Sequence, residues 1–343
     1  MTPAGGLALS VAVLVAGAVV ITVVGTRMAF LADRLADRTG LGEAFVGAVF
    51  LGASTSLPGI TASVTAAWDG LASLALSNAL GGIAAQTAFL AIADIVYRKA
   101  NLEHAAASLG NMMWGALLIT LLAALLVAMS GPEISLLGVH PVTPLLFAFY
   151  VVGARMVAAA REHPMWRPRI TRATRVDRPA PTPKGEGGLA GLWLAFGGAA
   201  LVVCVAGWGV VQAGEVLAVR TGLSESLVGG LLVAVITSLP ELVTSVAAVR
   251  QGALTLAVGG VLGGNAFDTL FAAMADVAYR EGSLFHAVSP REAALAAFTV
   301  LMGAILLLGL LHRQRTGPGR IGWESGLVLI LYLLAVLILG SEP

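Results

Sequence analysis

Ten apolar stretches divide the sequence, and each is long enough to cross the hydrocarbon core of a lipid bilayer. A backbone inside lipid must satisfy its hydrogen bonds within its own segment, so these stretches are expected to be α-helices. Only 11% of the residues are charged, whereas soluble proteins carry about 25%. The predicted spans are 7–28, 42–67, 71–96, 105–129, 134–158, 189–213, 224–249, 253–279, 288–311 and 321–340. The predicted fold is therefore an all-α polytopic membrane protein with ten transmembrane helices.

The longest polar interruption, residues 161–188, is rich in Pro and Arg and has no amphipathic period. It predicts a cytoplasmic linker between an N-terminal unit, 1–160, and a C-terminal unit, 189–343, of five helices each. With the N-terminus outside, 17 of the 20 Lys and Arg residues fall on the side of this linker. No Lys or Arg precedes Arg27, so the first span is predicted to be retained and not cleaved as a signal peptide. The expected location is the inner (plasma) membrane.

The sequence also contains an internal duplication. Residues 41–105 align without a gap to 223–287 at a constant offset of 182, with 28 identities in 65 positions. Five helices separate the copies, and because five is odd, the second copy must cross the membrane in the opposite sense. The two units are therefore predicted to be inverted five-helix repeats, an arrangement that places a substrate site near the membrane midplane.

Two motifs recur inside the duplication. The segments Thr-Ser-Leu-Pro begin at Thr55 and Thr237, and a proline at this place breaks the helix and frees carbonyl groups. The pairs Gly81-Gly82 and Gly263-Gly264 permit close helix approach and local unwinding. Hydroxyl and carbonyl oxygens from the broken helices are therefore expected to face the midplane.

Two carboxyl groups are predicted to lie at the depth of these motifs. Glu241 follows the second Thr-Ser-Leu-Pro segment, and Asp268 lies in the helix that contains Gly264. An ionisable group at the membrane midplane is costly and indicates a functional site, although a protonated carboxyl that only links helices is the alternative. Oxygen ligands of this kind suit calcium, sodium or protons. The candidate ion ligands are the carboxyl and hydroxyl groups of Glu241, Asp268, Thr237, Ser238, Thr55 and Ser56.

These motifs resemble the alpha repeats of the calcium/cation exchanger superfamily, which includes the sodium/calcium exchangers. The resemblance implies a central bundle of the second, third, seventh and eighth helices, with the first and sixth sliding across it. It also implies that the six ligands named above bind the ion. The sequence departs from the family pattern at four positions: Gly59 replaces an acidic residue, Gln86 replaces Asn, and Gly82 and Gly264 replace Ser. Water can fill the gap left by Gly59.

The expected function is secondary active antiport of calcium or a related cation against sodium or protons, by alternating access. The alternatives are a monovalent cation/proton exchanger and a non-transporting membrane scaffold or sensor that keeps the exchanger fold. An enzyme is not expected, because the sequence shows neither a His cluster for a metal nor a nucleophile–base pair. The expected partners are inorganic cations and the lipid bilayer, without nucleic acid. No cofactor is expected, since calcium or sodium enters as a transported substrate.

Two further aspartates are placed one helical turn before an arginine. Asp94 precedes Arg98, and Asp276 precedes Arg280, in each case by four residues. This spacing favours an ion pair on one helix face. The prediction is therefore a salt bridge at the end of each of these two helices, with a role in proton or ion entry as the alternative.

Overall fold

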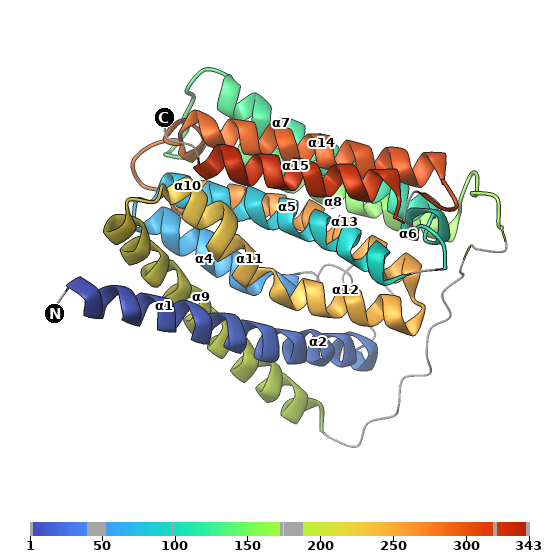
Figure 1. The fold of residues 1–343 in the computed structure, drawn as a ribbon, viewed down its shortest axis with the longest axis horizontal. Helices are drawn as coiled ribbons and strands as arrows, with labels where there is room; N and C mark the ends of the chain where they lie inside the picture. The colour runs from blue at the N-terminus through green and yellow to red at the C-terminus, as the bar shows by residue number, and fades with distance from the viewer. Residues whose placement is uncertain are drawn as a thin grey trace.

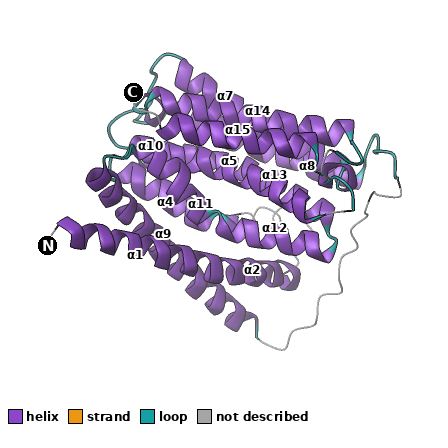
Figure 2. Ribbon diagram, viewed as in Figure 1, coloured by secondary structure: helices purple, strands orange, loops and turns teal. Residues whose placement is uncertain are grey.

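The computed structural model describes residues 3–39, 53–97, 99–171, 174, 188–317 and 321–340, which form helices joined by turns (Figures 1 and 2). Eight of the helices in these ranges are long and apolar enough to cross a membrane. A ninth candidate is a pair, Glu225–Thr237 and Leu239–Arg250, that is bent by 47°. The predicted span 42–67 begins outside the described residues. The all-α membrane fold is confirmed, and the count of ten spans stays a prediction.

The helices, including short π segments (η1, η2) and a 3-10 turn (η3), are bounded as follows: α1 Pro3–Val20, η1 Ile21–Gly25, α2 Thr26–Thr39, α4 Leu57–Trp68, α5 Ala72–Val96, α6 Leu102–Ala105, α7 Leu109–Ser130, α8 Val142–Glu162, α9 Leu189–Thr221, α10 Glu225–Leu227, η2 Val228–Val233, α11 Ala234–Thr237, α12 Leu239–Gln251, α13 Leu254–Ala278, η3 Leu284–His286, α14 Pro290–His312 and α15 Trp323–Gly340.

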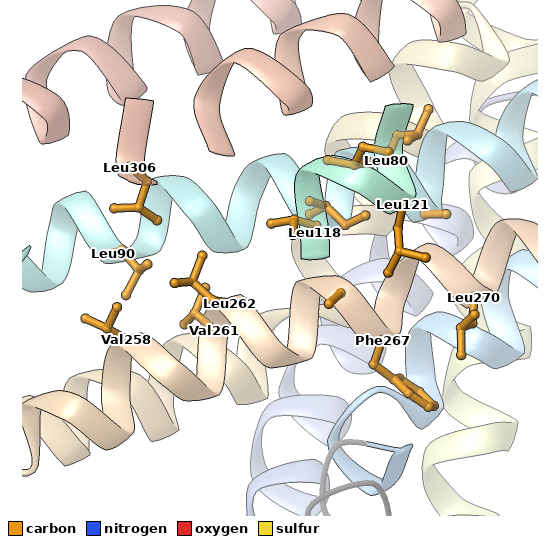
Figure 3. Close-up of a cluster of buried hydrophobic side chains, with 14 of the residues drawn as sticks. Leu80, Leu90, Leu118, Leu121, Val258, Val261, Leu262, Phe267, Leu270 and Leu306 are labelled. Atoms are coloured by element: carbon orange, nitrogen blue, oxygen red, sulfur yellow. The ribbon is translucent and has the colours of Figure 1, made fainter. Parts of the chain in front are cut away.

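Helices α5 and α13 lie at the centre of the bundle (Figure 1). Their apolar windows are 83% and 78% buried, far more than those of the other spans. The helices α1, α2 and α9 pack together on one side, while α7, α14 and α15 cover the other. Leucine, valine and phenylalanine side chains of α5, α7, α13 and α14 pack against one another in the core (Figure 3). Polar residues on α5 and α13 are thereby held away from both lipid and water.

The two central helices run in opposite directions. Near the start of α5, the Ser73 hydroxyl accepts a hydrogen bond from the Ser289 N–H, and the Ser77 hydroxyl donates to Glu292. Both partners follow the end of α13, so the start of one helix lies beside the end of the other. Inverted repeats require this relation for their equivalent helices, although the inversion of the complete units stays a prediction.

A close backbone crossing fixes α5 against η2. A Cβ added at Gly81 would lie 2.2 Å from the carbonyl oxygen of Gly230, so only glycine fits there. The close approach expected of the glycine pair is confirmed at this position. The expected unwinding is wrong, because α5 and α13 remain helical through Gly82 and Gly264. The helix breaks occur at the prolines instead.

The carboxylate of Asp276 is a hydrogen-bond acceptor for backbone groups. Its Oδ1 accepts from the Leu284 N–H at 3.0 Å, and its Oδ2 accepts from the His140 N–H at 2.8 Å and the Thr143 hydroxyl at 2.6 Å. The Arg280 guanidinium lies instead 5.3 Å from the centroid of the Trp68 ring. The predicted Asp276–Arg280 salt bridge is therefore wrong, because buried N–H groups bind the carboxylate.

Asp94 forms the equivalent contacts at the other end of the bundle. Its Oδ1 accepts from the Leu102 N–H at 2.7 Å and its Oδ2 from the Gly322 N–H at 2.9 Å. The partners of the two aspartates, Leu102 with Leu284 and His140 with Gly322, also differ by the offset of 182. The structural repeat therefore extends beyond the aligned sequence. The predicted Asp94–Arg98 pair involves Arg98, which lies outside the described residues.

Replacement of Asp276 by Asn is expected to destabilise the fold by about 1.5–3 kcal/mol, the usual contribution of a hydrogen bond to a charged group. An amide nitrogen cannot accept from the N–H and hydroxyl groups that the carboxylate binds. Thermal unfolding in detergent measures the effect. Asp69→Asn is the matched control, because Asp69 is exposed and accepts a single hydrogen bond from Gln212. Equal unfolding temperatures in the two variants contradict this role for Asp276.

Candidate functional site

The two Thr-Ser-Leu-Pro segments lie where helices break. Ser56 directly precedes α4, and Pro58 is the second residue of that helix. Ser238 lies between α11 and α12, at the 47° bend of this helix pair. A proline has no N–H to donate to the preceding turn, so each helix restarts at its serine. The sequence therefore directs two serine hydroxyls to the interruptions of two buried helices.

Asp268, on α13, joins these breaks to the central helices. Ser56 Oγ donates to Asp268 Oδ1 at 2.6 Å, and Gln86 Nε2 donates to Asp268 Oδ2 at 2.7 Å. The same Gln86 Nε2 also lies 3.3 Å from Ser238 Oγ, to which it donates. Asp268 is 1% exposed and Gln86 is 2% exposed. Four polar side chains from both repeats thus meet at one buried point.

Glu241 lies in the first turn of α12, beside this cluster. The residue as a whole is partly exposed, yet its Oε2 is buried and has no hydrogen-bond partner in the part of the chain that the structure describes. Its carboxyl group interacts electrostatically with that of Asp268. Two carboxyl groups from consecutive helices of the second repeat therefore face the same region.

Thr237 and Thr55 lie in the turns that precede the two serines. Thr237 is buried, and its hydroxyl donates to Asn78 Oδ1 at 3.4 Å and to the Ala234 carbonyl at 3.2 Å. Thr55 is only partly buried. Ser56, Ser238, Glu241 and Asp268 are thus assembled as the sequence predicts. The Thr237 hydroxyl donates to Asn78 and not to a member of this cluster, and ligand roles for Thr237 and Thr55 stay predictions.

Asn78 is a polar member of the site that the sequence analysis did not single out. Its Nδ2 donates to the Gly59 carbonyl at 3.1 Å and to Ser63 Oγ at 2.8 Å. The Asn78 amide nitrogen therefore holds the first helix break against α5. Its amide oxygen accepts a hydrogen bond from Thr237, at the second break. A signal was available in the sequence, because Asn78 replaces a glycine of the second repeat, Gly260, within an apolar helix.

The space beside Gly59 is filled by an aromatic ring. A Cβ added at Gly59 would lie 2.5 Å from Phe271 Cε2. The Phe271 ring packs against the Gly59 backbone, and the expectation that water lies beside Gly59 stays a prediction. Gly59 thus stands where the second repeat has Glu241, and an aromatic side chain of the second repeat packs against it.

The chemistry of this site suits a hard cation or a proton. Its ligating atoms are oxygens, and it has no sulfur or imidazole among the described residues named above. The two carboxylates can together supply a charge of about −2, which matches one calcium ion, although calcium usually recruits six to eight oxygens. A smaller oxygen set favours ions that need fewer ligands. The arrangement can therefore bind calcium with additional ligands, or sodium or protons without them.

The chain is similar to known proteins over nearly its whole length. A sequence profile of the family described as sodium/calcium exchanger protein matches residues 9–155 and 191–340. The inner membrane protein YrbG of Escherichia coli is 26% identical over 323 residues, which cover 91% of each chain. The sodium/calcium exchanger MaX1 of Methanosarcina acetivorans is 36% identical over 121 residues, which are 34% of this chain and 31% of that protein. The solved structure of the H+/Ca2+ exchanger CAX superimposes with a TM-score of 0.67 at 12% identity, over 97% of this chain and 82% of that one.

Proposed function

Because the chain belongs to the sodium/calcium exchanger family, we propose that it is a secondary active antiporter that exchanges calcium or a related cation for sodium or protons. It is a polytopic membrane protein and a transporter, not an enzyme. Two similar proteins support the exchange of calcium. One is the sodium/calcium exchanger MaX1, which is similar in sequence, and the other is the H+/Ca2+ exchanger CAX, which is similar in structure.

One observation carries the proposal at the level of residues, namely the buried Oε2 of Glu241, which no donor among the described residues reaches. A carboxylate without a partner in a membrane interior is strongly destabilising. A proton or a metal cation removes this cost, and the neighbouring Asp268 adds a second negative charge for either ligand. Glu241 is therefore the central ligand, and competition between two ions for it couples their movements.

Gln86 is part of the same exchange. Its amide nitrogen donates to both Asp268 and Ser238. The nitrogen therefore occupies the place that a cation bound between these two residues would take. A cation must therefore displace the amide nitrogen, after which the Gln86 carbonyl oxygen can turn towards the ion. Gln86 Oε1 has no partner among the described residues, so it is available as a ligand. Thr237, Ser238, Thr55 and Ser56 supply neutral oxygens at the two helix breaks.

A monovalent cation/proton exchanger is the second candidate, and the Gly59–Phe271 contact favours it. The ring of Phe271 removes space for a carboxylate on the first repeat, so the site holds two acidic groups and not three. A site with less negative charge and fewer oxygens is weaker for calcium than for sodium or a proton.

The proposed location is the inner membrane, with the N-terminus outside and the linker 161–188 on the cytoplasmic side. The bias of Lys and Arg towards the linker side supports this orientation. The similarity to an inner membrane protein of Escherichia coli over 91% of the chain supports the location.

Flux measurements on the purified protein in liposomes test the proposed function. Calcium uptake is expected when an opposed gradient of sodium or protons is imposed, and not in protein-free liposomes. Movement of sodium against protons without calcium flux selects the second candidate. If no pair of gradients among sodium, potassium, protons and calcium drives flux, the antiporter proposal is overturned and a scaffold or sensor remains.

A further inference from the structure

Three buried carboxyl groups gather at the end of the bundle where α5 finishes. Asp94 comes from α5, Glu103 from α6 and Glu324 from α15, and they are 0%, 1% and 0% exposed, respectively. Helix α6 lies beside the right-hand end of α5 in Figure 1. Asp94 lies eight residues, or about two helical turns, beyond Gln86. This group is therefore separate from the candidate cation site.

The three carboxyl groups differ in their partners. Both oxygens of Asp94 accept backbone N–H groups, so its charge is satisfied. Glu103 Oε1 accepts one hydrogen bond, from the Ser325 hydroxyl at 3.3 Å. Glu103 Oε2 and both oxygens of Glu324 are buried and receive no donor from the described residues. The carboxyl groups of Glu103 and Glu324 contact each other directly, so two acceptors face one another.

No basic side chain among the described residues around the pair forms an ion pair with it. The titratable groups that face it are Asp94 from α5 and His312 at the end of α14. Arg313, in the adjacent loop, donates instead to the carbonyls of Arg169 and His104 and to the Thr174 hydroxyl. Burial raises the pKa of Glu103 well above its ordinary value of 4.5, and the charges of Asp94 and Glu324 raise it further.

Two glycines leave the room that brings Glu324 to this place. A Cβ added at Gly309 would lie 2.7 Å from Glu324 Cγ, and one added at Gly322 would lie 2.9 Å from Glu324 Cδ. Gly309 is on α14, and Gly322 directly precedes α15. The Glu324 side chain thus fits into a space that larger residues would close, which indicates a built pocket for its carboxyl group.

We propose that Glu103 and Glu324 form a proton-binding site in which one proton is shared between their carboxyl groups. A proton supplies the missing donor, since a protonated carboxyl donates to its neighbour. A metal ion fits less well, because the described residues contain no group of three His, Cys, Asp or Glu side chains arranged to hold one. The shared proton joins α6 to α15 next to the end of α5. In the proposed orientation, this end of the protein faces the cytoplasm.

The sign of the pH dependence follows from the raised pKa of Glu103. A group that binds its proton more tightly in the folded chain than in the unfolded chain stabilises the fold at low pH. This stabilisation is complete below the ordinary carboxyl pKa and is lost as pH rises through the raised pKa. Loss of the proton leaves two charged carboxylates in contact beside Asp94. Alkaline pH is therefore expected to loosen α6 and α15 from α5.

Infrared spectroscopy of the purified protein tests the site without any need for transport. At neutral pH, the infrared band from the carbonyl stretch of protonated carboxyl groups is expected to lose the intensity of one carboxyl group in Glu103→Gln. The same loss is expected in Glu324→Gln. In each variant, the new amide donates to the remaining carboxylate and replaces the proton. Glu133→Gln is the control, because Glu133 is exposed at the opposite end, and it is expected to keep the full band.

A second readout is the unfolding temperature in detergent as a function of pH. It is expected to fall in the unmodified protein as pH rises above the ordinary carboxyl pKa, and to stay flatter in both glutamine variants. An unchanged carboxyl band in both variants overturns the proposal. If sodium or calcium removes the part of the band that both glutamine variants lack, the proposal is also overturned, because the ligand of this pair is then a metal cation. Neither readout depends on antiport, so failure here leaves the proposed function intact, and the reverse also holds.

Discussion

Replacement of Glu241 by Gln is expected to lower cation exchange by about a hundredfold or more, which corresponds to about 2.7 kcal/mol. Glutamine keeps the size of the side chain but cannot carry the charge or the exchangeable proton. Since Glu241 Oε2 has no donor among the described residues, its interaction with the transported ion or proton is not shared with a structural partner in that part of the chain. The initial rate of calcium uptake into liposomes, driven by sodium or proton gradients, measures the effect.

The matched comparison separates the site from general damage to the protein. Glu133→Gln makes the same chemical change at an exposed position and is expected to keep the full rate. Asp268→Asn is expected to be both slower and less stable, because Asp268 also accepts hydrogen bonds from Ser56 and Gln86. An unchanged rate in Glu241→Gln, with the protein folded, contradicts the proposed site.

The course of the chain through the membrane could be predicted from hydrophobicity because the bilayer allows few alternatives. Of the structures that satisfy their backbone in lipid, only a helix fits an uninterrupted apolar stretch of this length, so 105–129 already defines a span that the structure places at Leu109–Ser130. The helix breaks were also predictable, since Pro58 and Pro240 remove backbone donors whatever packs around them. The behaviour of the glycine pairs was not, because it depends on neighbours from distant parts of the chain.

The side-chain partners in the site were harder to predict for the same reason. Comparison of the repeats identified Glu241, Asp268 and Gly59, because a carboxylate in an apolar helix is visible without a structure. It could not show that Gln86 donates to Asp268 or that Phe271 packs on Gly59, since both contacts cross between the repeats. The partners of Asp276 were also hard to predict: sequence spacing suggested Arg280, yet the N–H groups of Leu284 and of the distant His140 bind the carboxylate.

The contact between Gly59 and Phe271 leads to a prediction about ion selectivity. Gly59→Glu alone is expected to fold poorly, because its Cβ would lie 2.5 Å from the Phe271 ring and overpacking costs about 1–3 kcal/mol. Phe271→Ala opens the space but leaves a cavity, at a cost of about 3–5 kcal/mol. The double variant is expected to be more stable than the sum of the two single changes, because each relieves the defect of the other.

The double variant is also expected to raise the ratio of calcium flux to sodium flux by about tenfold, or about 1.4 kcal/mol. A third carboxylate adds charge and oxygen ligands, and calcium benefits from both more than a monovalent ion does. The control is Gly59→Gln with Phe271→Ala, which has the same shape without the charge. Equal flux ratios in the two double variants, both folded, contradict the role of the missing carboxylate. A higher ratio only with glutamate shows that selectivity is set by charge at this position, since the two chains otherwise have the same packing.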